Sequence, residues 1–260
     1  MEKQKQESLV IVICTCDAYQ DALGPLFTLL TRYWPQCKNY KIVLNTESLD
    51  YQFDGLEITS FNLYGGKTEG ITWSKRLRDT LEQISSKYVF IYLDDFYLCR
   101  EVDNDMFNKC VDFLDMHENA ANINVHYSPS HKRPLKDFPL LARRSRLSRY
   151  LLNLQASIWR RDCLMDCLRE HESAWDLERF GSIRAMFSRR DFYTVLTPIF
   201  YYRPDLHGLS RGKWNPHTPE LFNKEGIVID FSRRGVLQVG EWTRPHWNIN
   251  LQKLWRSFVK

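Results

Sequence analysis

The sequence predicts an α/β protein with a mostly parallel central sheet flanked by helices. Short apolar runs alternate with amphipathic segments along the first half of the chain, which is typical of strands joined by single helices. Hydrophobic residues make up 43% of the 260 residues, enough for a sizeable core. In such sheets ligands bind beyond the carboxyl ends of the strands. The polar residues that follow each apolar run are therefore the first candidates for a site.

The first half supplies the clearest elements. Strands are predicted at 9–15, 40–46, 56–63 and 122–127, and the stretch "YVFIYLDDFYL" from Tyr88 to Leu98 begins as a strand buried on both faces. Helices are predicted before Pro35, from about Thr72 after the Gly-rich loop "YGGKTEG", and around Cys110. We expect residues 1–127 to form the first of two halves of the protein.

The second half, residues 128–260, is expected to share the same sheet. Strands are predicted at 150–159 and 192–202, helices at 160–172 and 173–190, and a polar loop at 203–216. The basic run within 142–149 is expected in a loop or short exposed helix, as a solvated face or as an attraction for an acidic membrane surface. Trp247, Leu251, Leu254, Trp255 and Phe258 have helical spacing. We expect this C-terminal helix to pack on the body, with docking at a membrane interface as the alternative.

Composition excludes several classes of protein. The net charge of +4 suits a partner that carries phosphates but is too small for a dedicated nucleic-acid binder, so no nucleic-acid partner is expected. No signal segment and no apolar stretch of about 20 residues is visible, and the seven scattered cysteines are expected to be reduced. These features favour a cytoplasmic protein, with peripheral contact at the inner face of the membrane as an alternative.

Asp94 and Asp95 form the most informative pair. They follow a buried strand directly, and adjacent carboxylates repel each other unless something compensates their charge. An exposed strand end or a helix cap is the plain interpretation. The functional interpretation is a divalent metal, Mn²⁺ or Mg²⁺, which prefers carboxylate and phosphate oxygens.

The stretch "IYLDDF" resembles the Asp-x-Asp motif of GT-A-type, family 2-like bacterial glycosyltransferases, in its shortened Asp-Asp form. Other segments resemble landmarks of that family in the same order: "VICTCDAY" the nucleotide-cradling first strand and loop, "GITWSKRLRDTL" the helix before the metal strand, "AWDLERFGS" the acceptor-side helix, and "HGLSRGKW" the loop over the diphosphate. The resemblance covers roughly Leu9 to Trp214. It implies a GT-A-like nucleotide-diphospho-sugar transferase fold and a bacterial enzyme of surface polysaccharide biosynthesis. We expect residues 1–127 to be the nucleotide-sugar-binding half and residues 128–260 the acceptor-side half.

Site residues follow from these segments. The catalytic base is expected to be Glu178, with Asp176 as reserve, because inverting transfer needs a carboxylate that deprotonates the attacking hydroxyl. Asp95 and His207 are the candidate metal ligands, and His207 stands with Arg211 and Lys213 in a loop suited to a diphosphate. The candidate donor-binding residues are Thr15, Asp17, Tyr19, Glu47, Trp73, Arg76, Asp94, Arg211 and Lys213.

The sequence thus predicts a metal-assisted, inverting glycosyltransferase that moves a sugar from a nucleotide-diphosphate donor to a glycan or lipid-linked glycan. One alternative is a nucleotidyltransferase that makes a nucleotide-sugar on the same sheet. That class is expected to carry a Gly-rich, basic signature after the first strand, which "CDAYQDALGP" does not supply. A non-enzymatic RNA- or membrane-binding module is the other alternative, and the acids at the sheet edge argue against it.

Overall fold

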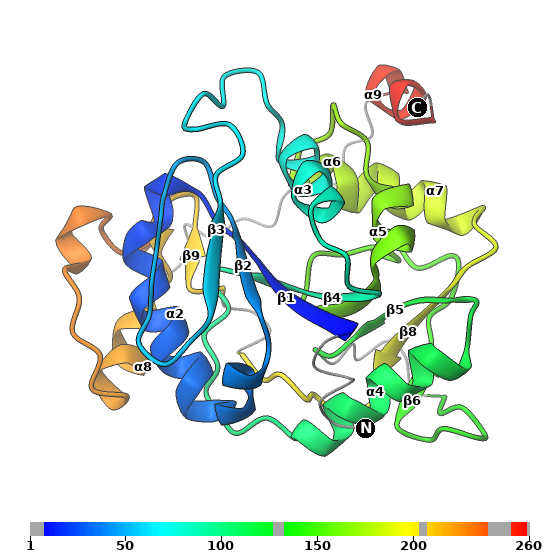
Figure 1. Ribbon diagram of the computed structural model, residues 1–260, viewed down its shortest axis with the longest axis horizontal. Helices are drawn as coiled ribbons and strands as arrows, with labels where there is room; N and C mark the ends of the chain where they lie inside the picture. Colours follow the sequence, from blue (N-terminus) through cyan, green and yellow to red (C-terminus); the bar gives the residue numbers. More distant parts are fainter. Residues whose placement is uncertain (1–7, 127–132, 203–206, 239–250, 259–260) are drawn as a thin grey trace.

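The computed structural model describes residues 8–126, 133–202, 207–238 and 251–258, and it confirms the predicted α/β class (Figure 1). Within these ranges eight strands form one sheet in the order β3-β2-β1-β4-β7-β5-β8-β6. Their bounds are β1 Leu9–Cys14, β2 Ile42–Asn45, β3 Ile58–Phe61, β4 Tyr88–Leu93, β5 Ala120–Asn124, β6 Leu141–Arg143, β7 Ser157–Arg160 and β8 Asp191–Val195. A separate hairpin pairs β9 (Leu209–Ser210) with β10 (Lys213–Trp214).

The sheet is mostly parallel, as predicted. Strand β1 pairs in parallel with β2 and β4, β2 with β3, and β5 with β8. Strand β7 is antiparallel to both of its neighbours, β4 and β5, and β6 is antiparallel to β8. Because β7 lies between β4 and β5, strands from both halves of the chain alternate within one continuous sheet.

Helices cover both faces of this sheet (Figure 1). Their bounds are α2 Gln20–Tyr33, α3 Trp73–Glu82, α4 Asn104–Met116, α5 Arg161–Cys167, α6 Ala174–Asp176, α7 Ser182–Met186, α8 Thr218–Lys224 and α9 Leu251–Phe258. Shorter turns are η1 Asp17–Tyr19, η2 Pro35–Asn39, the π-helical η3 Leu177–Gly181, and η4 Phe231–Arg233. None of the helices in the described ranges is long and apolar enough to cross a bilayer.

Two core layers follow from the alternation of side chains along β1. Ile11 and Ile13 pack in the layer that holds the apolar residues of α2 and α4. Val10 and Val12 pack in the layer formed with α3, α5 and α7. Because β1 is buried on both faces, its six residues "LVIVIC" are all apolar.

The second half departs from the sequence prediction in several places. Strand β7 begins only at Ser157 and β8 ends at Val195, so both are shorter than the predicted 150–159 and 192–202. Strand β6 lies in the segment expected to be a loop or exposed helix, and helix α8 was not predicted. Trp247 of the predicted C-terminal helix lies outside the described residues.

The expectation of a solvated basic face for the run within 142–149 is wrong for its central member. Arg144 is buried, and its guanidinium donates to the carbonyls of Tyr150 and Leu151, the latter at 2.9 Å. Arg143 pairs with Asp191 of β8. These arginines hold the β6 edge in place because backbone carbonyls and one carboxylate use their donors.

Candidate functional site at the carboxyl edge of the sheet

The topology of β1 creates a crevice at one edge of the sheet. The chain passes from β1 to β2 and β3 on one side and then returns to β4 on the other side. In register, Cys14 at the end of β1 pairs with Asn45 of β2 and with Leu93 of β4. The residues that follow these three strand ends therefore lie side by side at a topological switch point, where α/β proteins bind ligands.

Asp94 and Asp95 lie at this edge, as predicted. Asp94 is only 6% exposed and hydrogen-bonds to the Thr15 side chain, while Asp95 interacts with the backbone N–H of Leu209. Burial raises the pKa of both carboxyls well above the ordinary range, and the neighbouring charge of Asp95 adds to the increase for Asp94. The pair would be stabilised in its charged form by a bound cation.

The residues at this edge can hold a metal ion only if a bound substrate supplies the remaining coordinating atoms. Among the described residues, no three His, Cys, Asp or Glu side chains come close enough together to hold a metal ion. Asp94, Asp95 and His207 therefore do not form a ready cage. Mg²⁺ and Mn²⁺ are commonly held by one or two carboxylates together with phosphate oxygens, and the Asp94–Asp95 pair suits that arrangement. The predicted metal ligation by Asp95 and His207 stays a prediction.

Asp17 joins the loops that follow β1 and β2. Its carboxylate accepts hydrogen bonds from the backbone N–H groups of Ser48 and Leu49, each at 3.0 Å, and from the hydroxyls of Ser48 and Thr46. Burial tends to raise the pKa of Asp17, but the bonds from Ser48 and its neighbours outweigh burial and lower it. Since the chain itself occupies the carboxylate, Asp17 shapes the site, and its direct contact with a donor stays a prediction.

Arg76 brings a buried positive charge to the same edge. It projects from α3, whose first turn is capped by the Thr72 hydroxyl at 3.1 Å from the N–H of Lys75. The Arg76 guanidinium pairs with Glu47 at 3.1 Å and donates to the carbonyl of Thr15, also at 3.1 Å. Its Nε is buried without a hydrogen-bond partner in the described structure. Arg76 and Glu47 thus meet beside Thr15, whereas Trp73 is half-buried at the start of α3.

Asp176, the reserve candidate for the base, is committed to local contacts. It forms a capping box with Ser173 at the start of α6, and it pairs with Lys253 of α9 at 3.3 Å. Burial tends to raise the pKa of Asp176, but the Ser173 hydroxyl and the Lys253 ammonium outweigh it, so the net shift is downward. A carboxylate with a lowered pKa and two fixed partners is a poor proton acceptor.

Glu178 lies differently, in the π-helical turn η3 next to α6. Its carboxylate accepts a hydrogen bond from the backbone N–H of Leu154 at 2.8 Å, and burial raises its pKa. The antiparallel register of β4 with β7 runs from Tyr88 opposite Arg160 to Ile91 opposite Ser157. Leu154, three residues before β7, therefore lies at the same edge as Asp94. This contact places Glu178 at the same edge of the sheet as the acidic pair.

A column of four stacked rings lies next to the acidic pair. His207 stacks on Phe96 at 5.1 Å between ring centroids, Phe96 on Tyr202 at 4.3 Å, and Tyr202 on His126 at 4.1 Å. The Tyr202 hydroxyl donates to Gln155 at 2.8 Å. Burial lowers the pKa of both histidines, so they are neutral near pH 7. Sequence reasoning missed His126 and Tyr202 because only long-range stacking connects them to the site.

The predicted phosphate-binding loop is a tight hairpin anchored to the acidic motif. The N–H of Gly208 donates to the carbonyl of Asp95 at 2.8 Å. At the tip, Arg211 and Gly212 have φ of 52° and 79°, as a two-residue hairpin turn of the I′ type requires. Arg211 and Lys213 are exposed on this hairpin. Their predicted contact with a diphosphate is compatible with that exposure and stays a prediction.

Arg234 is a cation of the site that sequence reasoning did not select. Its guanidinium pairs with Asp21, with Nε to Oδ2 at 2.8 Å, and lies 4.7 Å from the centre of the Tyr19 ring. It also lies 5.9 Å from the Trp214 ring centre, and its charge offsets a small part of the rise that burial causes in the pKa of Asp94. The signal for it in the sequence is slight, since "SRRGV" resembles an ordinary basic turn. Arg234 connects the C-terminal segment to the mouth of the site.

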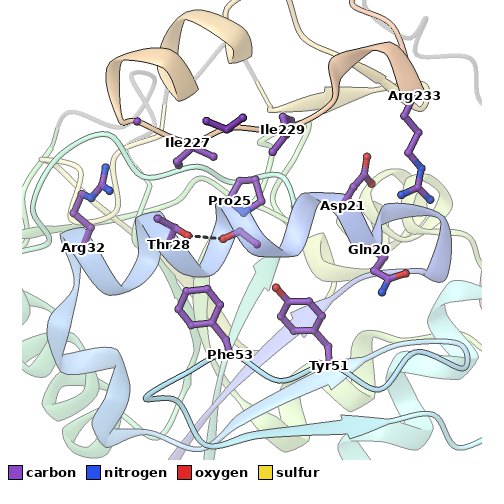
Figure 2. Close-up of a pocket in the computed structure, with 13 residues that line it drawn as sticks. Gln20, Asp21, Pro25, Thr28, Arg32, Tyr51, Phe53, Ile227, Ile229 and Arg233 are labelled. Carbon is purple, nitrogen blue, oxygen red and sulfur yellow. Dashed lines mark hydrogen bonds between the residues drawn. The ribbon is translucent and has the colours of Figure 1, made fainter.

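A groove of about 710 Å³ runs along α2 beside this region (Figure 2). Tyr51 and Phe53 lie on one side of the helix, and Ile227 and Ile229 lie on the other. Asp21, the partner of Arg234, lines the end of the groove that meets the site. None of the residues selected from the sequence lines this groove, so the acidic edge and the groove are neighbouring but different surfaces.

Comparison with solved structures shows that the fold is the GT-A-like fold of nucleotide-diphospho-sugar transferases. One match is S. aureus TarS 1–349 with UDP: 15% identity, 75% of this chain and 60% of that chain covered, TM-score 0.52. The TarS structure with UDP-GlcNAc matches at 14% identity over 87% of this chain and 69% of that one, TM-score 0.51. A CMP-2-keto-3-deoxy-manno-octonic acid synthetase with CTP matches at 14% identity over 84% and 96% of the two chains, TM-score 0.46.

These likenesses concern the fold alone. No protein-family model matches the chain, and no curated protein matches it. The chain spans 60% of the length of the TarS structure with UDP bound. Activity must therefore be argued from the site itself.

Proposed function

We propose that the protein is a glycosyltransferase that moves a sugar from a nucleotide-diphosphate donor to a hydroxyl of a glycan or lipid-linked glycan, with inversion, in surface polysaccharide biosynthesis. The observation that carries this proposal is the position of Glu178. The half-buried Glu178 carboxylate is held by the Leu154 N–H at the same edge of the sheet as the Asp94–Asp95 pair. Glu178 is thus a separate carboxylate at this edge, in addition to the Asp94–Asp95 pair, which suits a metal-bound diphosphate. The UDP and UDP-GlcNAc held by the matching TarS structures support a nucleotide-sugar donor.

Glu178 acts as the base in this proposal. Burial raises its pKa, which makes the ionised carboxylate a stronger proton acceptor than an exposed glutamate. It takes the proton from the acceptor hydroxyl as that oxygen attacks the anomeric carbon. The attack comes from the side opposite the departing diphosphate, so the new bond has inverted configuration.

Positive charge must stabilise the leaving diphosphate. The guanidinium groups of Arg234 and Arg76 lie near the acidic edge, and Lys213 and Arg211 lie on the hairpin that is hydrogen-bonded to Asp95. Mn²⁺ or Mg²⁺, if held by Asp95 and the phosphate oxygens, supplies further charge neutralisation. Phe96, next to Asp95, stacks on His207, which precedes the hairpin. This contact holds the hairpin beside the Asp95 backbone.

Nucleotidyl transfer is the second candidate, because the same fold serves it. The segment between β1 and Arg32 contains no Lys or Arg, and the Asp17 carboxylate within it is occupied by the β2 loop. A triphosphate substrate would need cations in that segment. This observation favours glycosyl transfer. A non-enzymatic binding module is less well supported, since Arg144 of the basic run is buried and the exposed Arg143 pairs with Asp191.

The test is the Glu178→Gln variant. Glutamine keeps the oxygen that accepts from Leu154 but cannot take a proton, so nucleotide binding should stay unchanged while turnover falls by about 10²–10⁴-fold. Release of nucleoside diphosphate from a panel of donors, measured with and without Mn²⁺, gives the rate, and NMR of the product gives its configuration. Glu220→Gln is a matched control, since Glu220 is exposed on α8.

Three outcomes would contradict parts of the proposal. Retained configuration would exclude the single displacement. Full turnover by Glu178→Gln would move the base to another residue. Release of pyrophosphate from a nucleoside triphosphate and a sugar phosphate, without sugar transfer, would establish the nucleotidyltransferase instead.

A further inference from the structure

Among the α9 side chains that the structure describes, 253–258, the most buried one and the one that forms an ion pair with the body are both polar. Ser257 is fully buried, and its carbonyl accepts a hydrogen bond from Arg169 at 3.2 Å. Lys253, four residues earlier and therefore on the same stripe of the helix, pairs with Asp176 at 3.3 Å. Leu254 is half-buried beside them. The contact that fixes the rotation of α9 is thus made by a serine and a lysine.

The aromatic side of α9 points away from the body as a consequence. Trp255 is 75% exposed and Phe258 is 49% exposed. The sequence predicts the opposite, because the apolar face of an amphipathic helix ordinarily packs on the core. Arg256 lies exposed between these two aromatic residues in the sequence.

A second exposed tryptophan stands on the element that receives α9. Trp175 of α6 is 61% exposed and directly precedes Asp176, the partner of Lys253. Figure 1 places α9 next to α6. The exposed aromatic residues therefore come from two elements that an ion pair joins. Arg256 adds positive charge to the same region, while the charge of Lys253 is balanced by Asp176. We call Trp175, Trp255, Phe258 and Arg256 the α9 face.

We propose that the α9 face docks on the surface of an anionic lipid bilayer. Tryptophan and phenylalanine beside lysine and arginine suit the boundary between headgroups and acyl chains, where aromatic rings insert and cations meet anionic lipid. The partner is a bilayer rather than a second protein because the face combines bulky aromatic residues with the exposed charge of Arg256 on a short helix. The earlier basic run is not part of this face: Arg144 is buried in the body, and Arg143 is paired with Asp191.

Docking would also orient the site. The turn η3 that carries Glu178 follows α6 directly and contacts α9. A bilayer on the α9 face would therefore lie about one helix diameter, roughly 10 Å, from the turn that carries the proposed base, and a lipid-linked acceptor would have to reach across this distance. The docking itself does not depend on the proposed chemistry, because vesicle binding is measured without donor or acceptor.

The experiment is cosedimentation of the full chain with vesicles. One set contains phosphatidylcholine and phosphatidylglycerol, and the other contains phosphatidylcholine alone. The wild type should bind the anionic vesicles, and Trp255→Ala combined with Phe258→Ala should lower the partition coefficient by about tenfold or more. Arg256→Gln should lower binding to anionic vesicles by about fivefold and leave binding to neutral vesicles unchanged. Phe187→Ala is the matched control: Phe187 is 78% exposed at the end of α7, and its loss should change nothing.

The variants should fold normally, since the changed side chains are exposed, and circular dichroism checks this. Equal partitioning by the wild type and the Trp255→Ala/Phe258→Ala variant would overturn the proposal. No binding to anionic vesicles would overturn it too. A dimer in sedimentation velocity that Trp255→Ala dissociates, without vesicle binding, would assign the face to a second copy of the chain.

Discussion

Gly208→Ala should disrupt the site through a single methyl group. A Cβ at this position would lie 2.0 Å from Cε2 and 2.5 Å from Cδ2 of Tyr97, and 3.1 Å from the backbone carbonyl oxygen of Asp95. Carbon atoms in contact stand about 3.5–4.0 Å apart, so the ring would have to move by roughly 1.5 Å. Tyr97 is buried, with its ring 4.8 Å from Phe222 and 6.4 Å from Trp214, and has little room to move.

The loss of stability in Gly208→Ala has two contributions. Overpacking of a buried ring costs about 1–3 kcal/mol. Loss of the 2.8 Å hydrogen bond from the Gly208 N–H to the Asp95 carbonyl adds about 1 kcal/mol. We expect the free energy of unfolding to fall by about 2–4 kcal/mol. UDP binding should weaken as well, because the displaced backbone carries the acidic pair.

Urea unfolding of the wild type, Gly208→Ala and Gly24→Ala provides the assay. Gly24 lies inside α2, and a Cβ there would lie 3.7 Å from the Tyr51 hydroxyl, an ordinary contact. Gly24→Ala should therefore stabilise the protein by about 0.5–1 kcal/mol through helix propensity. The reasoning is refuted if Gly208→Ala unfolds within about 0.5 kcal/mol of the wild type, a change typical of uncrowded surface positions.

Two further predictions concern the acids of the site. Asp17→Ala should destabilise the protein at pH 7 by about 1–2 kcal/mol, discounted because Asp17 is partly exposed. The lowered pKa of Asp17 means that its contribution is present above the unfolded value of about 3.9 and is lost as pH falls through the lower folded value. The difference between the urea midpoints of wild type and Asp17→Ala should therefore be smaller at pH 3 than at pH 7. An equal difference at the two pH values would argue against the bonds to Ser48 and Leu49. Asp95→Asn should abolish the tightening of UDP binding by Mn²⁺ while the fold persists. Calorimetry with and without Mn²⁺ measures this, and undiminished tightening in Asp94→Asn and Asp95→Asn alike would rule out metal ligation by the pair.

The carboxyl edge of the sheet was predictable because its signals are local. Strands β1 and β4 are continuous apolar runs followed at once by polar residues, and α3 begins at a capping threonine. These features are enough to assign Thr15, Asp94 and Arg76 to one edge from the sequence. The parallel ladder then brings them together.

The positions of Arg144, His126 and α9 depend on long-range contacts that no local sequence pattern indicates. Arg144 is buried because its donors meet backbone carbonyls, and any residue type supplies a carbonyl. His126 joins the site through stacking on Tyr202, far along the chain. The helical spacing of α9 was predicted correctly, but its rotation is set by Lys253 and Ser257, which pattern alone assigns to solvent.

The place of β7 in the sheet has a consequence for how the chain folds during synthesis. Within the described ranges, strand β5 pairs only with β7 and β8, and both of these emerge later from the ribosome. Until residue 157 is available, the buried strand β5 has no partner and β4 presents an open edge that can pair with another chain. We therefore expect a fragment that ends at residue 127 to aggregate instead of folding. A nascent chain would need protection over this interval. The step that adds β7 is also the one that brings Leu154, the hydrogen-bond partner of Glu178, to the edge of the sheet where Asp94 lies.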